Sequence, residues 1–249
     1  MRKIFNYIIN TPLSFVGLKL VRKKALELLM ERPDHMPIEA SQNDKNLIEL
    51  CGKYSLTGSV RMWALIQALK YIQKHNIEGD LVECGVWKGG SLGLMSLLSE
   101  QLDISKKVFG FDTFDGMTDP EEVDVDWQGF SAKETMQNSP KDEKILNVHA
   151  FASLNQVKNN LIQMGVKDNV SLIPGKVEET LLVDENVPKK ISLLRLDTDW
   201  YQSTKTELEI LYPRLQPGGI LIIDDYGHFK GAQKAVDEYF KGQNVWLHY

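Results

Sequence analysis

The sequence predicts an α/β protein with a mostly parallel central sheet and helices on both faces of that sheet. From residue 80 onward, short apolar runs rich in β-branched residues alternate with longer segments in which apolar residues recur at the helical period. This alternation is typical of βαβ units, whose parallel strands are buried on both faces. The 43% hydrophobic and 25% charged content is that of an ordinary globular enzyme-sized domain.

Six apolar runs have the length and the bounding turns of strands. The predicted strands are Asp80–Cys84, Val108–Phe111, Val170–Ile173, Ile191–Asp197, Gly219–Asp224 and Val245–His248. The predicted helices are Ser59–His75, Ser91–Gln101, Leu154–Met164, Ser203–Tyr212 and Ala232–Phe240. Pro213 and Gly242 follow the last two helices, as expected of residues that end a helix.

Two regions lie outside this alternation and are expected to cover a site. Residues 1–78 are predicted to form an N-terminal helical cap, and residues 79–249 the domain that carries the sheet. The apolar stretch Ile4–Leu20 is interrupted by polar residues and by Pro12, so we do not expect it to span a membrane. Thr113–Asn147 is acidic, aromatic and rich in turns, and a connection of this length is more often a functional lid than filler.

Charge and cysteine content narrow the class of partner. The formal net charge is -5, whereas nucleic acid and anionic membranes are usually met by a basic surface. Cys51 and Cys84 are the two cysteines, so we predict neither a disulfide framework nor a thiolate metal site. We therefore expect a cytoplasmic protein that acts on a small molecule and binds no nucleic acid.

The turn after the first predicted strand contains Gly85, Gly89 and Gly90 and runs directly into a helix. Glycines at this place let the backbone approach a ligand at the carboxyl edge of a parallel sheet. Their spacing is not G-x-G-x-x-G, which disfavours a dinucleotide, and no Lys-Ser or Lys-Thr pair follows, which excludes a P-loop. By itself the turn is equally compatible with tight packing between strand and helix.

Asp112 ends the second predicted strand, the one that follows the glycine turn. An acidic residue at that place can accept hydrogen bonds from the two hydroxyls of a ribose. The alternative is an Asp that starts a turn, which is common at strand ends. The position of Asp112 in the series of strands favours the ligand role.

Carboxylates also follow the fourth and fifth strands. If these strands are neighbours, Asp197, Asp224 and Asp225 converge at one edge of the sheet, where they repel one another unless a cation offsets them. Ligand sets made only of oxygen suit a hard cation such as Mg²⁺. A single Asp would more often cap a helix, but the whole set predicts a magnesium site.

Two residues near this set are candidates for a general base. A bound cation lowers the pKa of a coordinated oxygen acid, which would make an alcohol a better nucleophile. Asp199 is adjacent to the proposed ligand Asp197 but distinct from it, and it can accept the proton of that alcohol. His228 is the competing candidate, and the alternative for it is a histidine on a surface loop.

Five blocks of the sequence together resemble the macrocin O-methyltransferase (TylF-type) family, whose members methylate sugar hydroxyls in antibiotic and related glycoside pathways. The blocks are Tyr54–Thr57 with Arg61, Glu83–Gly90, Phe111–Met117, Leu196–Thr204 and Pro217–Tyr226. They occur in this order along the chain, and their joint occurrence is far more specific than any one block.

The resemblance implies a Rossmann-like class I methyltransferase fold with N-terminal helices, S-adenosylmethionine as the methyl donor, and Mg²⁺. In that family the first Asp of a D-x-D segment and an Asp-Asp pair bind the metal, and the second Asp of D-x-D is the base. These roles carry over to Asp197, Asp224 and Asp225 as ligands and to Asp199 as base. The residues expected at the cofactor are Tyr54, Thr57, Arg61, Glu83, Gly85, Val86, Gly89, Ser91, Asp112, Gly175, Thr180 and Asp197.

The leading hypothesis is therefore a homodimeric, Mg²⁺-dependent O-methyltransferase that acts on a sugar or a glycosylated small molecule. A catechol-like acceptor is the alternative within the same chemistry, and a non-catalytic cofactor-binding protein is the alternative outside it. Several convergent carboxylates are costly to bury, which argues against the non-catalytic alternative. Family members continue into a further strand after a segment like Val245–Tyr249, so we expect an incomplete last edge of the sheet.

Overall fold

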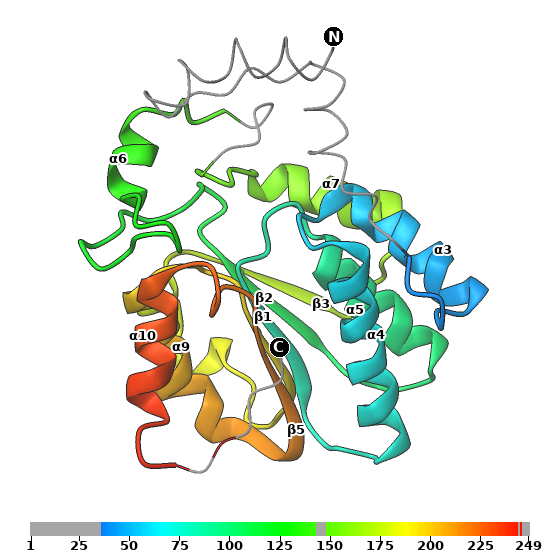
Figure 1. The fold of residues 1–249 in the computed structure, drawn as a ribbon. Helices are drawn as coiled ribbons and strands as arrows, with labels where there is room; N and C mark the ends of the chain where they lie inside the picture. The colour runs from blue at the N-terminus through cyan, green and yellow to red at the C-terminus, as the bar shows by residue number, and fades with distance from the viewer. Residues whose placement is uncertain (1–35, 143–147, 244, 246–249) are drawn as a thin grey trace, which may run out of the picture.

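The computed structural model describes residues 36–142, 148–243 and 245. Its sheet has five parallel strands in the order β3-β2-β1-β4-β5 (Figure 1). The strands are β1 (Asp80–Cys84), β2 (Val108–Asp112), β3 (Val170–Pro174), β4 (Ile191–Leu196) and β5 (Leu215–Ile223). This confirms the predicted fold class. The sixth predicted strand lies almost wholly outside the described residues, and the apolar stretch Ile4–Leu20 lies entirely outside them.

All five predicted helices are present, with ends within two residues of the predicted ones. The helices of the described ranges are α3 (Gln42–Cys51), α4 (Ser59–Lys74), α5 (Gly90–Gln101), α6 (Ala132–Gln137), α7 (Leu154–Met164), α8 (Val177–Thr180), α9 (Tyr201–Leu211) and α10 (Lys230–Tyr239). Short 3-10 helices are Gly52–Tyr54, Asp184–Asn186 and Tyr212–Arg214. None of the helices in these ranges is long and apolar enough to cross a membrane.

Helix α3 is absent from the sequence prediction, although its start carries a recognisable signal. The Ser41 hydroxyl accepts the Asp44 amide, and the Asp44 carboxylate accepts the Ser41 amide, which together form a capping box. Lys70 of α4 donates to both carboxylate oxygens of Asp44 at 2.7 and 2.8 Å. The same carboxylate therefore starts α3 and ties it to α4.

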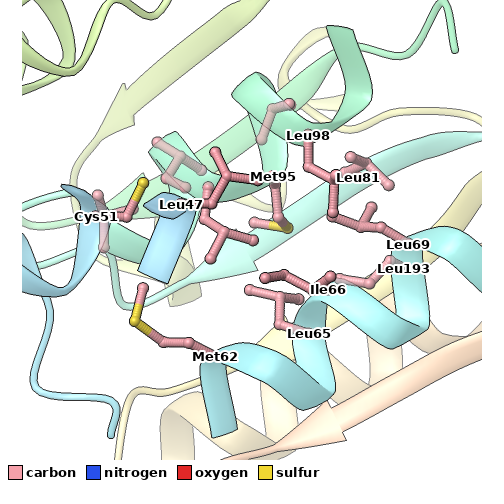
Figure 2. Packing of buried hydrophobic residues seen from close by; sticks show 14 of the residues in the cluster. Leu47, Cys51, Met62, Leu65, Ile66, Leu69, Leu81, Met95, Leu98 and Leu193 are labelled. Atoms are coloured by element: carbon pink, nitrogen blue, oxygen red, sulfur yellow. The ribbon is translucent and has the colours of Figure 1, made fainter. Parts of the chain in front are cut away.

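The helices cover both faces of the sheet, and each face has its own hydrophobic core (Figure 1). On one face, α3, α4, α5 and α7 pack on the strands, and Figure 2 shows Ile66 and Leu69 of α4 gathered with Leu81 of β1 and Leu193 of β4. On the other face, α9 and α10 contribute residues such as Leu208 to the second core. The described helices of the predicted N-terminal cap thus share a core with the sheet, and the boundary at residue 78 stays a prediction.

Strand β5 begins four residues earlier than predicted, at Leu215 instead of Gly219. Leu215 pairs with Ile191, but Ile220 already pairs with Leu193, so β5 carries extra residues against β4. Gly218, with φ of +82°, helps accommodate them in the backbone. The Pro-Gly-Gly segment at residues 217–219 is thus a bulge within the strand.

The strand order places a ligand-binding crevice at the carboxyl ends of β1 and β4. The chain runs from β1 outward to β2 and β3, and then returns to the other side of β1 to form β4 and β5. In open parallel sheets, ligands bind where the strand order reverses in this way. Asp112, which ends β2, and the acidic residues that follow β4 and β5 all lie at this edge.

Candidate active site

A cavity of about 410 Å³ opens at the carboxyl ends of the strands. This volume is within the range of small-molecule sites. The sequence-predicted site residues that line it are Thr57, Arg61, Glu83, Gly85, Val86, Ser91, Asp112, Gly175, Asp197, Asp199, Asp224, Asp225 and His228. Met117 and Thr118, from the connection Thr113–Asn147, also line the cavity.

Three residues expected at the cofactor lie outside the lining of this cavity. The Tyr54 hydroxyl donates to the Gln163 side chain at 2.9 Å. Gly89 caps the start of α5 in a left-handed conformation, with φ of +89°. Thr180 is the last residue of α8, and its hydroxyl donates to the backbone oxygen of Lys176, which precedes that helix.

Gly85 lets the ends of β1 and β4 meet. Its φ is +84°, and a Cβ atom there would lie 1.8 Å from the backbone oxygen of Asp197. The Asp197 amide donates to Cys84 O at 2.9 Å, which fixes the two chain segments at this distance. The glycine is thus required by the close approach of the Asp197 backbone, in addition to its conformation, whereas the sequence pattern predicts close approach to a ligand.

We expect Gly85→Ala to abolish binding of S-adenosylhomocysteine and to lower Tm strongly, because the new methyl group collides with rigid backbone. Gly129→Ala is the matched control, since Gly129 also has a positive φ, of +93°, but has nothing within 4 Å of the added atom. This control should lower the free energy of unfolding only by the cost of placing an L residue in a left-handed conformation, about 1–2 kcal/mol. Equal Tm values and equal calorimetric affinities for the two variants would refute the steric argument.

The Asp112 carboxylate is held by backbone amides at the edge of the cavity. It accepts from Val86 and Trp87 of the glycine turn at 2.7 and 2.9 Å, and from Phe114 at 2.7 Å. Burial raises the pKa of Asp112, while these amides lower it. The carboxylate therefore joins the glycine turn to the end of β2, and a carboxylate has further lone pairs for ligand hydroxyls.

Arg195 of β4 connects the acidic side chains of the site, and its role was not predicted from the sequence. The side chain is buried at 2% exposure. Its Nη1 donates to Glu83 Oε1 at 2.8 Å and to Asp197 Oδ2 at 2.7 Å, and its Nη2 donates to Thr57 Oγ1 and to Asp224 Oδ1, both at 2.9 Å. Although burial lowers it, these carboxylates hold the pKa of Arg195 above its ordinary value. One guanidinium group thus orients residues from four parts of the chain.

Glu83 is the register partner of Arg195 on the neighbouring strand, so the two side chains project from the same face of the sheet. Only 1% of Glu83 is exposed, and burial raises its pKa to about 8 even though Arg195 lowers it. Within the described part of the chain, Glu83 Oε2 has no hydrogen-bond partner. Because Glu83 lines the cavity, this oxygen can accept a hydrogen bond from a ligand or pair with a cationic group of that ligand.

Three carboxylates at the same edge form a candidate cation site. Asp197, Asp199 and Asp225 each offer an oxygen, and these oxygens lie within 4.8 Å of one another. The pKa of Asp197 is raised to about 8 and that of Asp199 to about 7, chiefly by burial and also by the neighbouring carboxylates. Among the residues that the structure describes, Asp225 Oδ2 is buried without a hydrogen-bond partner. A bound cation would offset the repulsion between the carboxylates and would give this oxygen a partner.

Asp224 lies beside this cluster but faces two arginines. Its Oδ1 accepts from Arg195, and its Oδ2 accepts from Arg61 of α4 at 2.5 Å. The sequence predicts that Asp197, Asp224 and Asp225 form the carboxylate cluster. In the structure, the third member beside Asp197 and Asp225 is Asp199 instead of Asp224. The difference arises because Asp199 has a φ of +66°, which strand periodicity does not predict.

His228, the alternative base, also lines the cavity. Its ring packs edge-on against Phe229, with the ring centroids 4.5 Å apart. Its amide donates to the backbone oxygen of Asp225 at 2.9 Å, so the position of His228 depends on the turn that follows β5.

A buried glutamate on α9 is a second residue that sequence reasoning missed. Glu207 has no exposed surface and accepts the Thr198 hydroxyl at 2.9 Å. Both omissions had a signal in the sequence. Arg195 is a charge within an apolar strand, and Glu207 lies one position before Leu208, on the side of α9 that faces the core. Charges at buried positions require partners, which makes such residues candidates for a polar site.

These features define a class I methyltransferase site, with a nucleoside-sized cavity at the switch point of a parallel sheet and acidic residues at each strand end. The sequence model of the macrocin-O-methyltransferase (TylF) family matches residues 20–247. The chain belongs to this family and is an S-adenosylmethionine-dependent O-methyltransferase.

Two curated relatives illustrate the family. The chain is 33% identical over 189 residues to 8-demethyl-8-(2,3-dimethoxy-alpha-L-rhamnosyl)-tetracenomycin-C 4'-O-methyltransferase of Streptomyces olivaceus. It is 30% identical over 189 residues to demethyldecarbamoylnovobiocin O-methyltransferase of Streptomyces niveus. Each comparison covers 75% of this chain and 67% of the relative.

Solved structures show the same fold. The structure of the O-methyltransferase NovP is similar with a TM-score of 0.65 and 28% identity, over 78% of this chain and 76% of that one. The calicheamicin methyltransferase CalS11 is similar with a TM-score of 0.59 and 20% identity, over 86% and 90% of the two chains. At that identity, the second likeness supports the fold alone.

Proposed function

We propose that this protein transfers a methyl group to a hydroxyl of a sugar or a glycosylated small molecule, and that it requires Mg²⁺. The sugar acceptor is supported by the relative from Streptomyces olivaceus, whose name describes a rhamnosyl substrate. The cation requirement is supported by Asp225 Oδ2, a buried carboxylate oxygen without a partner in the described ranges. A cytoplasmic location and a homodimer stay predictions of the sequence.

Three carboxylates would hold the metal in this proposal. Asp197 and Asp225 belong both to the set predicted from the sequence and to the cluster in the structure. We assign Asp224 as the third ligand, because it adjoins Asp225 and leaves Asp199 free for proton transfer. A bound Mg²⁺ would supply charge stabilisation and lower the pKa of an acceptor hydroxyl beside it.

Asp199 would accept the proton of the acceptor hydroxyl while that oxygen gains the methyl group. A general base works best when its pKa is near the working pH, and the pKa of Asp199 is raised to about 7, chiefly by burial. Asp199 lines the cavity, as does His228, so both are within the space that an acceptor can reach.

Glu83 and Asp112 are suited to the methyl donor. The unpaired Glu83 Oε2 can accept from the ammonium group of S-adenosylmethionine, and the Asp112 carboxylate can accept from its ribose hydroxyls. Both side chains are held before the ligand binds, Glu83 by Arg195 and Asp112 by the glycine turn. Because these side chains are already ordered, ligand binding loses less side-chain conformational entropy.

The acceptor class is tested by methyl transfer from labelled S-adenosylmethionine in the presence of Mg²⁺. The panel would contain rhamnosides and other glycosides with free hydroxyls, the matching aglycones, and catechol. We expect product from at least one glycoside and none from its aglycone. Methylation of catechol or of the bare aglycone in preference to every glycoside would overturn the proposal.

A further inference from the structure

The D-x-D turn adopts a backbone conformation that L residues rarely adopt. Asp199 has a φ of +66°, and across it the Trp200 amide donates to Thr198 O at 2.7 Å. An i to i+2 hydrogen bond around a residue of positive φ is the rare, strained form of the γ-turn. A strained residue of this kind persists only where the surrounding structure holds it.

Contacts from α9 hold this turn. The Thr198 hydroxyl donates to Glu207 Oε1 at 2.9 Å, and the Ser203 hydroxyl donates to Thr198 O at 3.3 Å. The buried Trp200 indole donates to Thr118 O at 2.9 Å. The bond to Glu207 is the one that fixes the side chain of the residue between the two aspartates.

The use of a glutamate at this place is not explained by packing. Glu207 is fully buried, and its second oxygen, Oε2, has no hydrogen-bond partner among the described residues. Burying a carboxyl group is unfavourable unless its hydrogen bonds compensate for lost hydration. An apolar residue would fill the same space in the core without that loss. The glutamate adds hydrogen bonds with the Cys84 thiol and the Thr198 hydroxyl, and the second is the one that reaches the D-x-D turn.

We propose that Glu207 is a positioning residue for methyl transfer: through Thr198 it holds the γ-turn and thereby aims the Asp199 carboxylate into the cavity. The proposal rests on the proposed role of Asp199 as the base. Without the Glu207 acceptor, the turn can relax toward negative φ, which displaces the Asp199 side chain. A displacement of about 1 Å in a reacting group can lower the rate about 100-fold.

Three variants test this contact in the full-length enzyme. Thr198→Val removes the donor, Glu207→Leu removes the acceptor, and Glu207→Gln keeps an oxygen acceptor in a side chain of the same size. We expect the first two to lower kcat about 100-fold, with the KM for S-adenosylmethionine and the calorimetric affinity for S-adenosylhomocysteine unchanged. Glu207→Gln should retain most of the activity. Thr206→Val, on the same helix, is the control and should match the wild type.

The outcomes separate the two proposals. Wild-type kcat in both Thr198→Val and Glu207→Leu, alongside an inactive Asp199→Asn enzyme, would overturn the positioning role alone. An active Asp199→Asn enzyme would overturn the base assignment and this inference with it. A loss of kcat that is matched by equal losses of cofactor affinity and Tm would also overturn it, because it would show a general structural role. If Glu207→Leu does not fold, Thr198→Val decides, since that side chain is only partly buried.

Discussion

Asp199→Asn should lower kcat by about 10²–10⁴-fold, the usual contribution of a general base, while the enzyme still binds Mg²⁺ and S-adenosylhomocysteine. The reason is that the amide keeps the size of the carboxylate but cannot accept the proton of the acceptor hydroxyl. The measurement combines single-turnover methyl transfer with two calorimetric titrations, one of Mg²⁺ and one of S-adenosylhomocysteine.

Asp224→Asn is the matched comparison, because it makes the same carboxylate-to-amide change at a nearby residue of the site. It should lose Mg²⁺ binding, as expected of a ligand. If Asp199→Asn loses Mg²⁺ binding and Asp224→Asn keeps it, then Asp197, Asp199 and Asp225 are the ligands, as their proximity in the structure would suggest. The base role would then pass to His228, which lines the same cavity.

Arg195→Met should destabilise the protein by about 3–5 kcal/mol, the usual effect of removing one partner from a buried ion pair. For a chain of this size, that corresponds to a fall in Tm on the order of 10 °C. The variant leaves Glu83, Asp197 and Asp224 without the cation that they share. Thermal unfolding of the metal-free protein measures the effect. Arg214→Met is the control, since Arg214 pairs with the exposed Asp184 and should contribute about 1 kcal/mol.

The destabilisation caused by Arg195→Met should also depend on pH, and the direction of this dependence follows from the pKa of Glu83. The pKa of Glu83 is raised to about 8 in the folded protein and would be higher without Arg195, which lowers it. A group with a raised pKa contributes stability that is present at low pH and is lost as pH rises through its folded pKa. The Tm difference between wild type and Arg195→Met should therefore be smallest below about pH 8 and grow as the pH rises beyond it, where Glu83 ionises in the wild type but stays neutral in the variant. A difference that is constant or larger at low pH would contradict the role of Arg195 as the shared cation.

The parts of the site that the sequence predicted are those that follow directly from strand order. Asp112, Asp197 and Asp224 each end or directly follow a recognisable apolar strand, and parallel strands bring their carboxyl ends to one edge. Gly85 was predicted at the site from the glycine turn at the end of the first strand, although the close contact that the structure shows there is with the Asp197 backbone and was not predicted.

The parts that the sequence did not predict depend on tertiary contacts. The sequence places Asp199 at the site as a base, but it does not predict that Asp199 joins Asp197 and Asp225 in one carboxylate cluster, since Asp199 has a positive φ that neither strand nor helix periodicity contains. The network around Arg195 joins Thr57, Glu83 and Asp224, residues far apart in the chain, so their distances are known only from the fold. Helix α3 was missed because its apolar pattern is short, although the Ser41 and Asp44 capping box marks its start.

The most direct test of the account is a calorimetric titration of the chelator-treated protein with Mg²⁺ in the presence of S-adenosylhomocysteine, paired with methyl transfer before and after Mg²⁺ is restored. The account predicts a saturable Mg²⁺ site, loss of methyl transfer in chelator, and recovery when the metal is returned. No heat of Mg²⁺ binding, together with undiminished methyl transfer in chelator, would contradict the assignment of the aspartate cluster as a metal site.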